Sequence, residues 1–134
     1  MKGSYVLILK VKKDVNCNIG RLGKTLFKKG FYAYVGSAMN GLERRVSRHL
    51  SSNKRFHWHI DYLLKCSNVE EVFYKESEKK EECTIAGAFN GFIFIEGFGS
   101  SDCKCRSHLF FSEFKEKLAE VCRNIGMKHY MVDE

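Results

Sequence analysis

The stretch that decides the fold of this chain is Phe31-Tyr32-Ala33-Tyr34-Val35-Gly36. Its aromatic and β-branched residues follow a Lys-Lys-Gly turn and predict a β-strand. Because successive side chains of a strand point to opposite faces, the two tyrosines share one face with Gly36. A glycine at the end of such a strand lets the backbone come close to a ligand. We therefore expect a binding site where this strand ends.

A basic helix is predicted shortly after that strand, over residues 42–50. Its apolar residues recur every four positions, as in an amphipathic helix. Arg45, Arg48 and His49 are spaced i, i+3 and i+4, so they share one face along the border of the apolar stripe. Two guanidiniums and an imidazole suit a phosphate group, because arginine offers its oxygens a planar fork of donors. The alternative is a basic face that only meets solvent.

The remaining segments complete an α/β fold. Residues 3–11 form a nearly continuous apolar run, which is typical of a central strand. Further elements are expected at 18–22 (strand), 58–65 (helix), 69–74 (strand), 81–95 (helix) and 107–111 (strand), before a last helix that Ser112 caps and Gly126 closes. This order predicts an α+β sandwich, with a small mixed or antiparallel central sheet flanked by helices, in one domain over residues 1–134.

Charge is divided unevenly between the two halves of the chain. Residues 1–65 hold 14 Lys+Arg against 3 Asp+Glu, a net +11, whereas residues 66–134 hold 9 against 13, a net −4. A cationic face of this kind attracts a polyanion such as nucleic acid, whereas a general basic bias would be spread more evenly. No stretch approaches the ~18 apolar residues of a membrane span, and the first apolar run is too short for a signal peptide. We expect a soluble, cytoplasmic protein with no membrane partner.

Glu82 is the acidic residue with the clearest chemical implication. In the helix expected over 81–95 it is in register with the apolar positions Ile85, Phe89 and Ile93. A buried carboxylate is costly unless it has a partner. One carboxylate, with waters and a substrate phosphate, is enough to hold Mg²⁺. Capping of the helix N-terminus is the alternative role.

The six cysteines are expected to be reduced, because the chain has no export signal. Cys103, Cys105 and His108 offer three possible zinc ligands, but a closed structural site needs four and the Cys-x-Cys spacing is unusually tight. We therefore expect these cysteines to be free of metal, and zinc is not an expected cofactor. The preceding loop, residues 97–102, is expected to organise a cleft through its amides, Ser101 and Asp102.

Residues 57–61 predict a second cluster of polar side chains. His57 and Asp61 are spaced i and i+4, and His59 lies between them, so the three can form a polar cluster. Histidines that simply face solvent are the alternative.

Three of these segments together resemble the GIY-YIG nuclease family. Gly3-Ser4-Tyr5 corresponds to the first element and Tyr34-Val35-Gly36 to the second. The run from Ser37 to Leu50, SAMNGLERRVSRHL, is similar almost position for position to the stretch that follows the second element in homing endonucleases of that family. The spacing between the two elements is longer than the family's common one and implies an insertion. Residues 54–64 and 97–109 resemble a narrower prokaryotic, notably archaeal, branch that is catalogued as a domain of unknown function and is sometimes fused to a repair glycosylase.

The resemblance implies a role for each matching residue. Tyr5 and Tyr34 would position or activate the attacking water, Arg45 would stabilise the phosphate with the help of His49, and Glu82 would hold one metal ion. Because a tyrosine with a pKa near ~10 is a poor base at pH 7, we expect nearby cations to lower that pKa. The residues expected to bind nucleic acid are Gly36, Ser37, Arg44, Arg48, Lys54 and His57. Further cleft residues are expected to be His59, Asp61, Ser101, Asp102, Cys103, Cys105 and His108.

The function expected from the sequence is therefore that of an endonuclease with one Mg²⁺ or Mn²⁺ ion, hydrolysing nucleic-acid phosphodiester bonds in DNA repair or processing. DNA is the expected partner rather than RNA. The main alternative is a non-catalytic nucleic-acid-binding module that keeps the fold and is indifferent to Glu82. A more distant alternative is an interaction or zinc-thiolate domain centred on Cys103, Cys105 and His108.

Overall fold

The computed structural model describes residues 1–52 and 54–130, which form an α+β sandwich. In chain order its elements are β1 (Gly3–Val11), β2 (Val15–Asn18), a 3₁₀ turn η1 (Gly20–Leu22), β3 (Lys24–Phe27), β4 (Gly30–Ala38), α1 (Leu42–Leu50), α2 (His59–Leu64), β5 (Asn68–Glu76), α3 (Glu82–Gly87), β6 (Ile93–Phe94), β7 (Leu109–Ser112), α4 (Lys115–Asn124) and β8 (Lys128–His129). The described part contains no helix long and apolar enough to cross a lipid bilayer.

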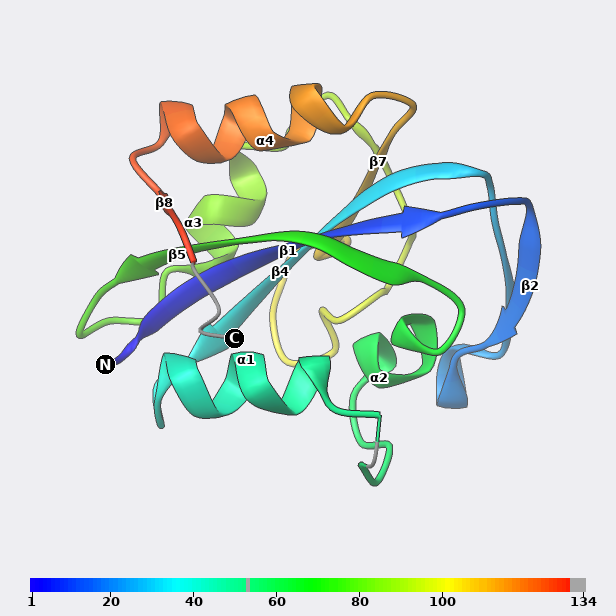
Figure 1. Ribbon diagram of the computed structural model, residues 1–134, viewed down its shortest axis with the longest axis horizontal. Helices are drawn as coiled ribbons and strands as arrows, with labels where there is room; N and C mark the ends of the chain where they lie inside the picture. Colours follow the sequence, from blue (N-terminus) through cyan, green and yellow to red (C-terminus); the bar gives the residue numbers. More distant parts are fainter. Residues whose placement is uncertain (53, 131–134) are drawn as a thin grey trace.

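The centre of the molecule is an antiparallel six-stranded sheet in the order β6-β7-β4-β1-β5-β8. β1 is a central strand, as its continuous apolar run predicts, and every residue from Gly3 to Leu9 is buried. β2 and β3 pair separately as a hairpin. In Figure 1 the sheet lies between α4 above it and α1 below it, so the molecule has three layers.

Strand alternation sorts the side chains into two cores. Tyr5, Leu7 and Tyr34 lie in the core that α1, α2 and the hairpin cover. Val6 and Val35 lie in the opposite core, which α3 and α4 cover. Tyr32 and Tyr34, which were predicted to share a face of the sheet, do lie in the same core, and Tyr5 of β1 lies there with them.

Gly36 is required by a neighbouring side chain. In the register of β1 and β4 it lies opposite Tyr5, and a Cβ built on Gly36 would lie 2.3 Å from the Tyr5 ring. Such a contact cannot be relieved without moving the ring. The Tyr5 ring is thus a structural reason for glycine at this position, and close approach of a ligand to its backbone stays a prediction.

Two predicted elements differ clearly from the structure. The strand expected over 18–22 is wrong: β2 ends at Asn18, and Gly20 and Gly23 have positive φ angles that build a turn. The helix expected over 81–95 ends at Gly87, and the chain then turns at Gly91, whose φ is 99°, into β6. The apolar spacing of that segment therefore reflects a short helix followed by an edge strand.

The last helix also starts later than predicted. Ser112 does not cap it, because α4 begins at Lys115 and its N-cap, Phe114, makes no side-chain capping bond. The Ser112 hydroxyl accepts a hydrogen bond from the Phe114 N–H at 3.1 Å, which forms a turn just before the helix.

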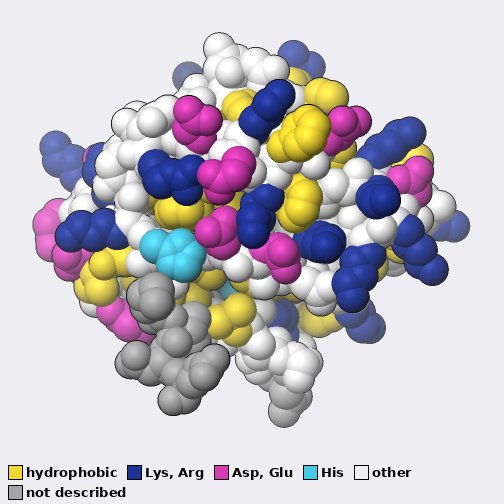
Figure 2. Space-filling view, turned by 45° about the horizontal axis from the view of Figure 1, so that its top comes forward, with side chains coloured by type: hydrophobic (Ala, Val, Ile, Leu, Met, Phe, Trp, Pro, Cys, Tyr) yellow, Lys and Arg dark blue, Asp and Glu magenta, His cyan; other side chains and the backbone are white. Residues whose placement is uncertain are grey.

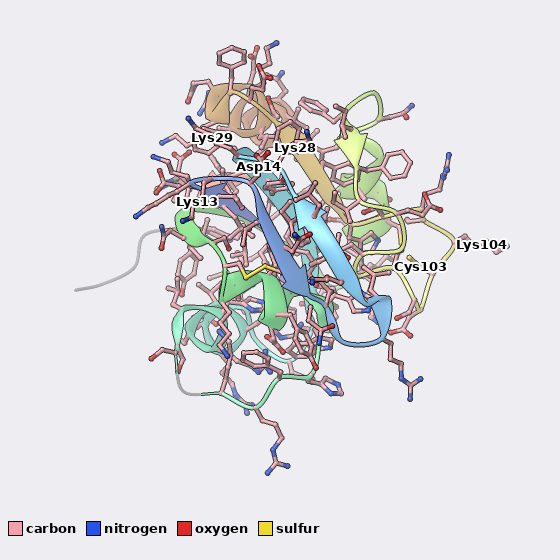
Figure 3. The ribbon with its side chains drawn as sticks, turned by 90° about the vertical axis from the view of Figure 1, so that its right-hand side faces the viewer. Lys13, Asp14, Lys28, Lys29, Cys103 and Lys104 are labelled. Carbon is pink, nitrogen blue, oxygen red and sulfur yellow. A yellow bond between two sulfur atoms is a disulfide. The ribbon has the colours of Figure 1, made fainter. Side chains whose placement is uncertain are left out.

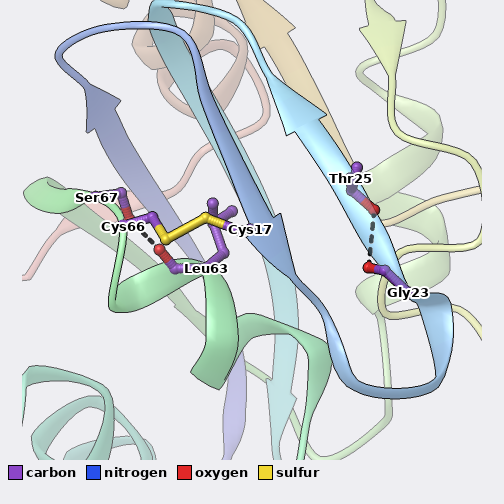
Figure 4. The surroundings of a disulfide bond; sticks show 6 residues. All are labelled: Cys17, Gly23, Thr25, Leu63, Cys66 and Ser67. Atoms are coloured by element: carbon purple, nitrogen blue, oxygen red, sulfur yellow. Dashed lines mark hydrogen bonds between the residues drawn. A yellow bond between two sulfur atoms is a disulfide. The ribbon is translucent and has the colours of Figure 1, made fainter.

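A disulfide joins Cys17 of β2 to Cys66, just after α2 (Figure 4). The expectation that all six cysteines are reduced is wrong for this pair. The two residues are 49 positions apart, so their approach depends on packing of the hairpin against α2 and leaves no local signal. Closing a loop of this length stabilises a fold by about 4 kcal/mol on the chain-entropy account.

Basic side chains are concentrated toward the hairpin. On the face in Figure 2, which includes α4, acidic and basic side chains are mixed, and Lys and Arg gather toward the side of the hairpin. Figure 3 shows Lys13, Lys28 and Lys29 together at the turns that precede β2 and follow β3, where Asp14 accepts a hydrogen bond from the Lys29 N–H at 2.7 Å. Three of the basic residues of the 1–65 half thus lie together at these turns.

Candidate active site and an adjoining thiol-imidazole cluster

A buried hydrogen bond between Tyr5 and His49 lies at the base of the predicted site. The Tyr5 hydroxyl is 2.7 Å from His49 Nε2, and the residues are 0% and 3% exposed. Burial raises the pKa of Tyr5 to about 12, although Arg45 opposes that shift, and burial lowers the pKa of His49 to about 3. Both groups are therefore neutral at pH 7.

Tyr34 lies beside this pair. Its ring centroid is 6.3 Å from that of Tyr5 and 6.3 Å from that of His49. Burial raises the pKa of Tyr34 well above its ordinary value, and the nearby Arg45 opposes this only in part. The prediction that cations lower the tyrosine pKa values is wrong, because loss of water outweighs the field of the arginine.

The Trp58 ring contacts the guanidinium groups of two arginines of α1. The guanidinium carbons of Arg45 and Arg48 lie 4.3 Å and 4.4 Å from the centroid of its ring. Arg45 also donates to the Ser37 carbonyl oxygen at 2.8 Å. Trp58 was not among the predicted site residues. The sequence does mark it, because it is the one tryptophan of the chain and lies directly before a helix, between two histidines.

Arg48 forms a bidentate ion pair with Asp61. The two guanidinium nitrogens donate to the two carboxylate oxygens at 2.7 Å and 2.9 Å. Asp61 is fully buried and also accepts from the backbone N–H groups of His57 and Trp58 at 2.8 Å and 2.9 Å. Burial opposes ionisation of Asp61, but these bonds together bring its pKa below the ordinary value. The predicted polar cluster thus uses the backbone of His57, whose side chain is exposed.

Lys54 closes the end of α1. Its ammonium donates to the carbonyl oxygens of Arg48, His49 and Ser51 at 3.2, 2.9 and 2.8 Å, a position favoured at a helix C-terminus. Arg44, one helical turn before Arg48, is exposed. A surface hollow of about 470 Å³ lies beside α1 and the turn before it. It is lined by Asn40, Gly41, Arg44, Arg45 and Arg48.

Glu82 begins α3 on the other side of Tyr34. It is half-buried, and its Oε2 is buried without a hydrogen-bond partner among the described residues. Burial raises the pKa of Tyr34 and lowers that of His108, and the charge of Glu82 adds to the first shift and opposes the second. Glu82 therefore stands between the tyrosine site and the cysteine-rich loop. Glu82, the residue predicted to hold the metal ion, thus has a carboxylate oxygen with no hydrogen-bond partner among the described residues.

The loop over residues 97–102 is attached to α2 through His59. His59 Nδ1 accepts a hydrogen bond from the Gly99 N–H at 2.9 Å, and its ring centroid is 5.5 Å from that of Phe98. Burial lowers the pKa of His59. Ser101 and Asp102 are exposed at the tip of the loop. His59 thus holds the loop against the site, and the roles of the other two residues stay predictions.

Three cysteines and one histidine converge beyond Glu82. The ligand atoms of Cys83, Cys103, Cys105 and His108 all lie within 4.8 Å of one another. Cys103 Sγ is 3.5 Å and Cys83 Sγ 3.9 Å from His108 Nε2. Cys103, Cys105 and His108 were predicted as possible ligands, and Cys83 was not. Cys83 lies twenty or more positions before them in the sequence, and it reaches them because α3 packs beside β4. Figure 3 shows Cys103 away from the lysine-rich turns.

Comparison with known proteins gives one family. Residues 4–131 match the family described as "Domain of unknown function DUF123". No curated protein and no solved structure gives a significant match to the chain. Because the match spans nearly its whole length, the chain belongs to the DUF123 family.

Proposed function

We propose that this member of the DUF123 family is a divalent-metal-dependent endonuclease that hydrolyses phosphodiester bonds in DNA, with a site built as in GIY-YIG nucleases. The observation that carries the proposal is the half-buried Glu82, whose Oε2 has no hydrogen-bond partner among the described residues. A carboxylate oxygen left in this state beside Tyr34 suits a bound cation, since leaving it unpaired is costly.

The other residues surround the same point from separate elements. Tyr5 comes from β1, Tyr34 from β4, and Arg45 and His49 from α1. The charges of Arg45 and Glu82 both act on Tyr34, the first lowering its pKa and the second raising it, against a larger rise caused by burial. A phosphate placed between them would meet a guanidinium and a carboxylate-held ion, which is the arrangement that phosphodiester hydrolysis needs.

The Tyr5–His49 pair would position the attacking water. With a pKa of about 12 Tyr5 is protonated at pH 7 and is not itself a base, and His49, with a pKa of about 3, is too weakly basic to take the proton. In the tautomer whose Nε2 carries no hydrogen, His49 accepts the Tyr5 O–H at 2.7 Å, so the hydroxyl oxygen can accept a hydrogen bond from the attacking water, whose proton would pass to bulk water. Arg45 stabilises the negative charge that develops on the phosphate. One Mg²⁺ or Mn²⁺ ion held by Glu82 would supply positive charge at the phosphate and at the leaving oxygen.

DNA would reach the site along the basic surface. The hollow lined by Arg44, Arg45 and Arg48 offers guanidinium groups to a phosphate. Two of these groups are already engaged, Arg45 by the Ser37 carbonyl and Arg48 by Asp61. Arg44 is exposed and is therefore proposed as the main backbone contact, with the lysine-rich turns beyond it as a second region of positive charge.

A non-catalytic nucleic-acid-binding module is the second candidate function. It is favoured by the burial of both tyrosines, which are 0% and 7% exposed, and by the rise of both pKa values. Such a module would use the arginine hollow and would not need Glu82.

Incubation of the purified chain with labelled branched, single-stranded and double-stranded DNA and RNA separates the two functions. The endonuclease proposal expects cleavage of DNA with Mg²⁺ or Mn²⁺ and none with EDTA. Arg45→Ala should abolish that cleavage, whereas Arg55→Ala, a change at a neighbouring exposed arginine, should not. Tight binding of DNA without cleavage of any substrate would favour the binding module.

A further inference from the structure

We infer that Cys83, Cys103, Cys105 and His108 form a tetrahedral zinc site that joins the start of α3 to the loop preceding β7. This site is separate from the single-ion site proposed at Glu82 and does not depend on nuclease activity.

The spacing of the four ligand atoms fits one ion. Zinc bonds of about 2.3 Å to sulfur and about 2.0 Å to nitrogen place tetrahedral ligands about 3.5–3.8 Å apart. The sulfur atoms of Cys103 and Cys83 are 3.5 Å and 3.9 Å from His108 Nε2, and the whole group spans no more than 4.8 Å. An iron–sulfur cluster would hold its ligands around a core of several atoms and so farther apart.

The chemistry of the ligands favours zinc. Three thiolates and one imidazole form a Cys₃His set, which is a closed structural zinc set, and soft sulfur ligands disfavour Mg²⁺ and Ca²⁺. The tight spacing of Cys103 and Cys105 argues against a zinc site only if that site has three ligands. Cys83 supplies the fourth from a different element, so Cys103 and Cys105 need not resemble a conventional paired-cysteine turn.

Hydrogen bonds hold the histidine in place for this role. The His108 N–H donates to the Phe98 carbonyl oxygen at 2.8 Å, and the His108 carbonyl oxygen accepts from the Val35 N–H at 2.9 Å. His108 is also buried. Its position is thus fixed by the edge of β4, and the cysteines of the loop gather around it.

The surrounding backbone explains what a zinc ion would do. Residues 95–108 connect β6 to β7 without any helix or strand, and α3 is a helix of six residues without a side-chain cap. Connections of this length are uncommon inside a compact domain unless something orders them. A zinc ion would fasten the loop to α3, and because Glu82 directly precedes Cys83 it would also fix Glu82 relative to Tyr34.

Metal analysis of the full chain, produced without a metal-affinity tag and kept reduced, tests the inference. Elemental analysis should find about one zinc per chain, as a closed site requires. After chelation, added Co²⁺ should give the intense visible bands of tetrahedral cobalt together with thiolate-to-cobalt charge transfer. Chelated protein should unfold at a lower temperature than the zinc form.

Variants assign the signal to the four residues. Cys83→Ser changes an exposed position, so the chain should fold, lose stoichiometric zinc and lose part of the charge-transfer band. Cys103→Ser should do the same. Cys122→Ala, which alters a buried free cysteine in α4, is the matched control and should keep the zinc. Glu82→Gln should keep it too, even though that variant removes the ion proposed for catalysis.

Several results would overturn the zinc site. They are absence of stoichiometric zinc or tetrahedral cobalt after reconstitution, full retention of both in Cys83→Ser and Cys103→Ser, iron in place of zinc, or a disulfide among the three cysteines in reduced protein. If zinc is present and no substrate is cleaved, the zinc site stands and the nuclease proposal fails. Cleavage without zinc would have the opposite meaning.

Discussion

The two ends of the site differ in how their polar groups are satisfied. On the side of α1 and α2, Arg48 pairs with Asp61, Arg45 with the Ser37 carbonyl, and Lys54 with the end of α1. On the side of α3, a carboxylate oxygen of Glu82 has no hydrogen-bond partner among the described residues, and three thiols meet an imidazole. The first side keeps its charged groups paired within the chain, although Ser37 Oγ and His49 Nδ1 are buried there without a hydrogen bond to the described residues. The second side has the donor atoms of metal sites, and cations would satisfy it.

The largest expected effect is a loss of stability on the side of α1 and α2. Arg48→Ala should destabilise the fold by about 3 kcal/mol, because it leaves the fully buried Asp61 charge without its bidentate partner. Denaturant unfolding measures the change. Arg55→Ala removes an exposed arginine in the same segment and should change stability by less than about 0.5 kcal/mol. Equal stability of the two variants would mean that the ion pair does not hold α2 in place.

The next effect tests the side that we expect to need a cation. Glu82→Gln keeps the shape of the side chain and should reduce cleavage by a factor of order 10² or more, with little change in DNA binding. Glu81→Gln is the matched control, because Glu81 Oε2 is likewise buried without a hydrogen bond among the described residues but lies 3.9 Å from the Lys75 ammonium. If Glu82 only caps α3, Glu82→Gln will lower stability by about 1 kcal/mol or less and leave cleavage intact. Melting temperature and cleavage, measured together, separate the two roles.

A pH titration of stability should reveal the buried His49. The unfolded chain takes up a proton on this residue below pH 6.5, whereas the folded chain does so only near pH 3, so stability falls as the pH drops through that window. The loss between pH 6.5 and pH 5 should be about 2 kcal/mol. His49→Gln should remove this part of the slope, and His57→Gln, at an exposed site, should not. An unchanged slope in His49→Gln would contradict neutral burial of the imidazole.

The smallest effect concerns DNA affinity. Arg44→Ala should lower the salt dependence of binding by about one unit of slope and weaken binding to all sequences alike. Lys117→Ala, on α4 across the sheet, is the control and should change neither quantity. Binding that does not depend on salt in the unaltered chain would contradict an arginine-lined contact surface.

The sequence predicts the periodic parts of the fold well. β1 is a central strand as expected, α1 has the predicted bounds, and Tyr32 and Tyr34 lie in the same core, as their alternation predicts. Hydrophobic spacing was enough for these elements because each buries one continuous side. The segment 81–95 failed because a short helix and an edge strand can imitate one long apolar stripe.

The contacts of the site were less accessible to sequence reasoning. Residue types and spacing singled out Arg45, His49 and Glu82, but no local pattern shows that Cys83 meets His108 or that Cys17 bonds to Cys66. Those contacts arise from packing between distant elements. The tyrosine pKa values were predicted in the wrong direction for a related reason, since charge counting does not measure burial.

The position of Trp58 gives the protein a built-in optical reporter. It is the one tryptophan of the chain, and two of the three guanidinium groups that line the proposed phosphate hollow, those of Arg45 and Arg48, lie against its ring. A phosphate that draws Arg45 away from the indole will alter its emission, with no other tryptophan contributing to the signal. Binding of unlabelled DNA can therefore be followed by fluorescence in the unmodified chain.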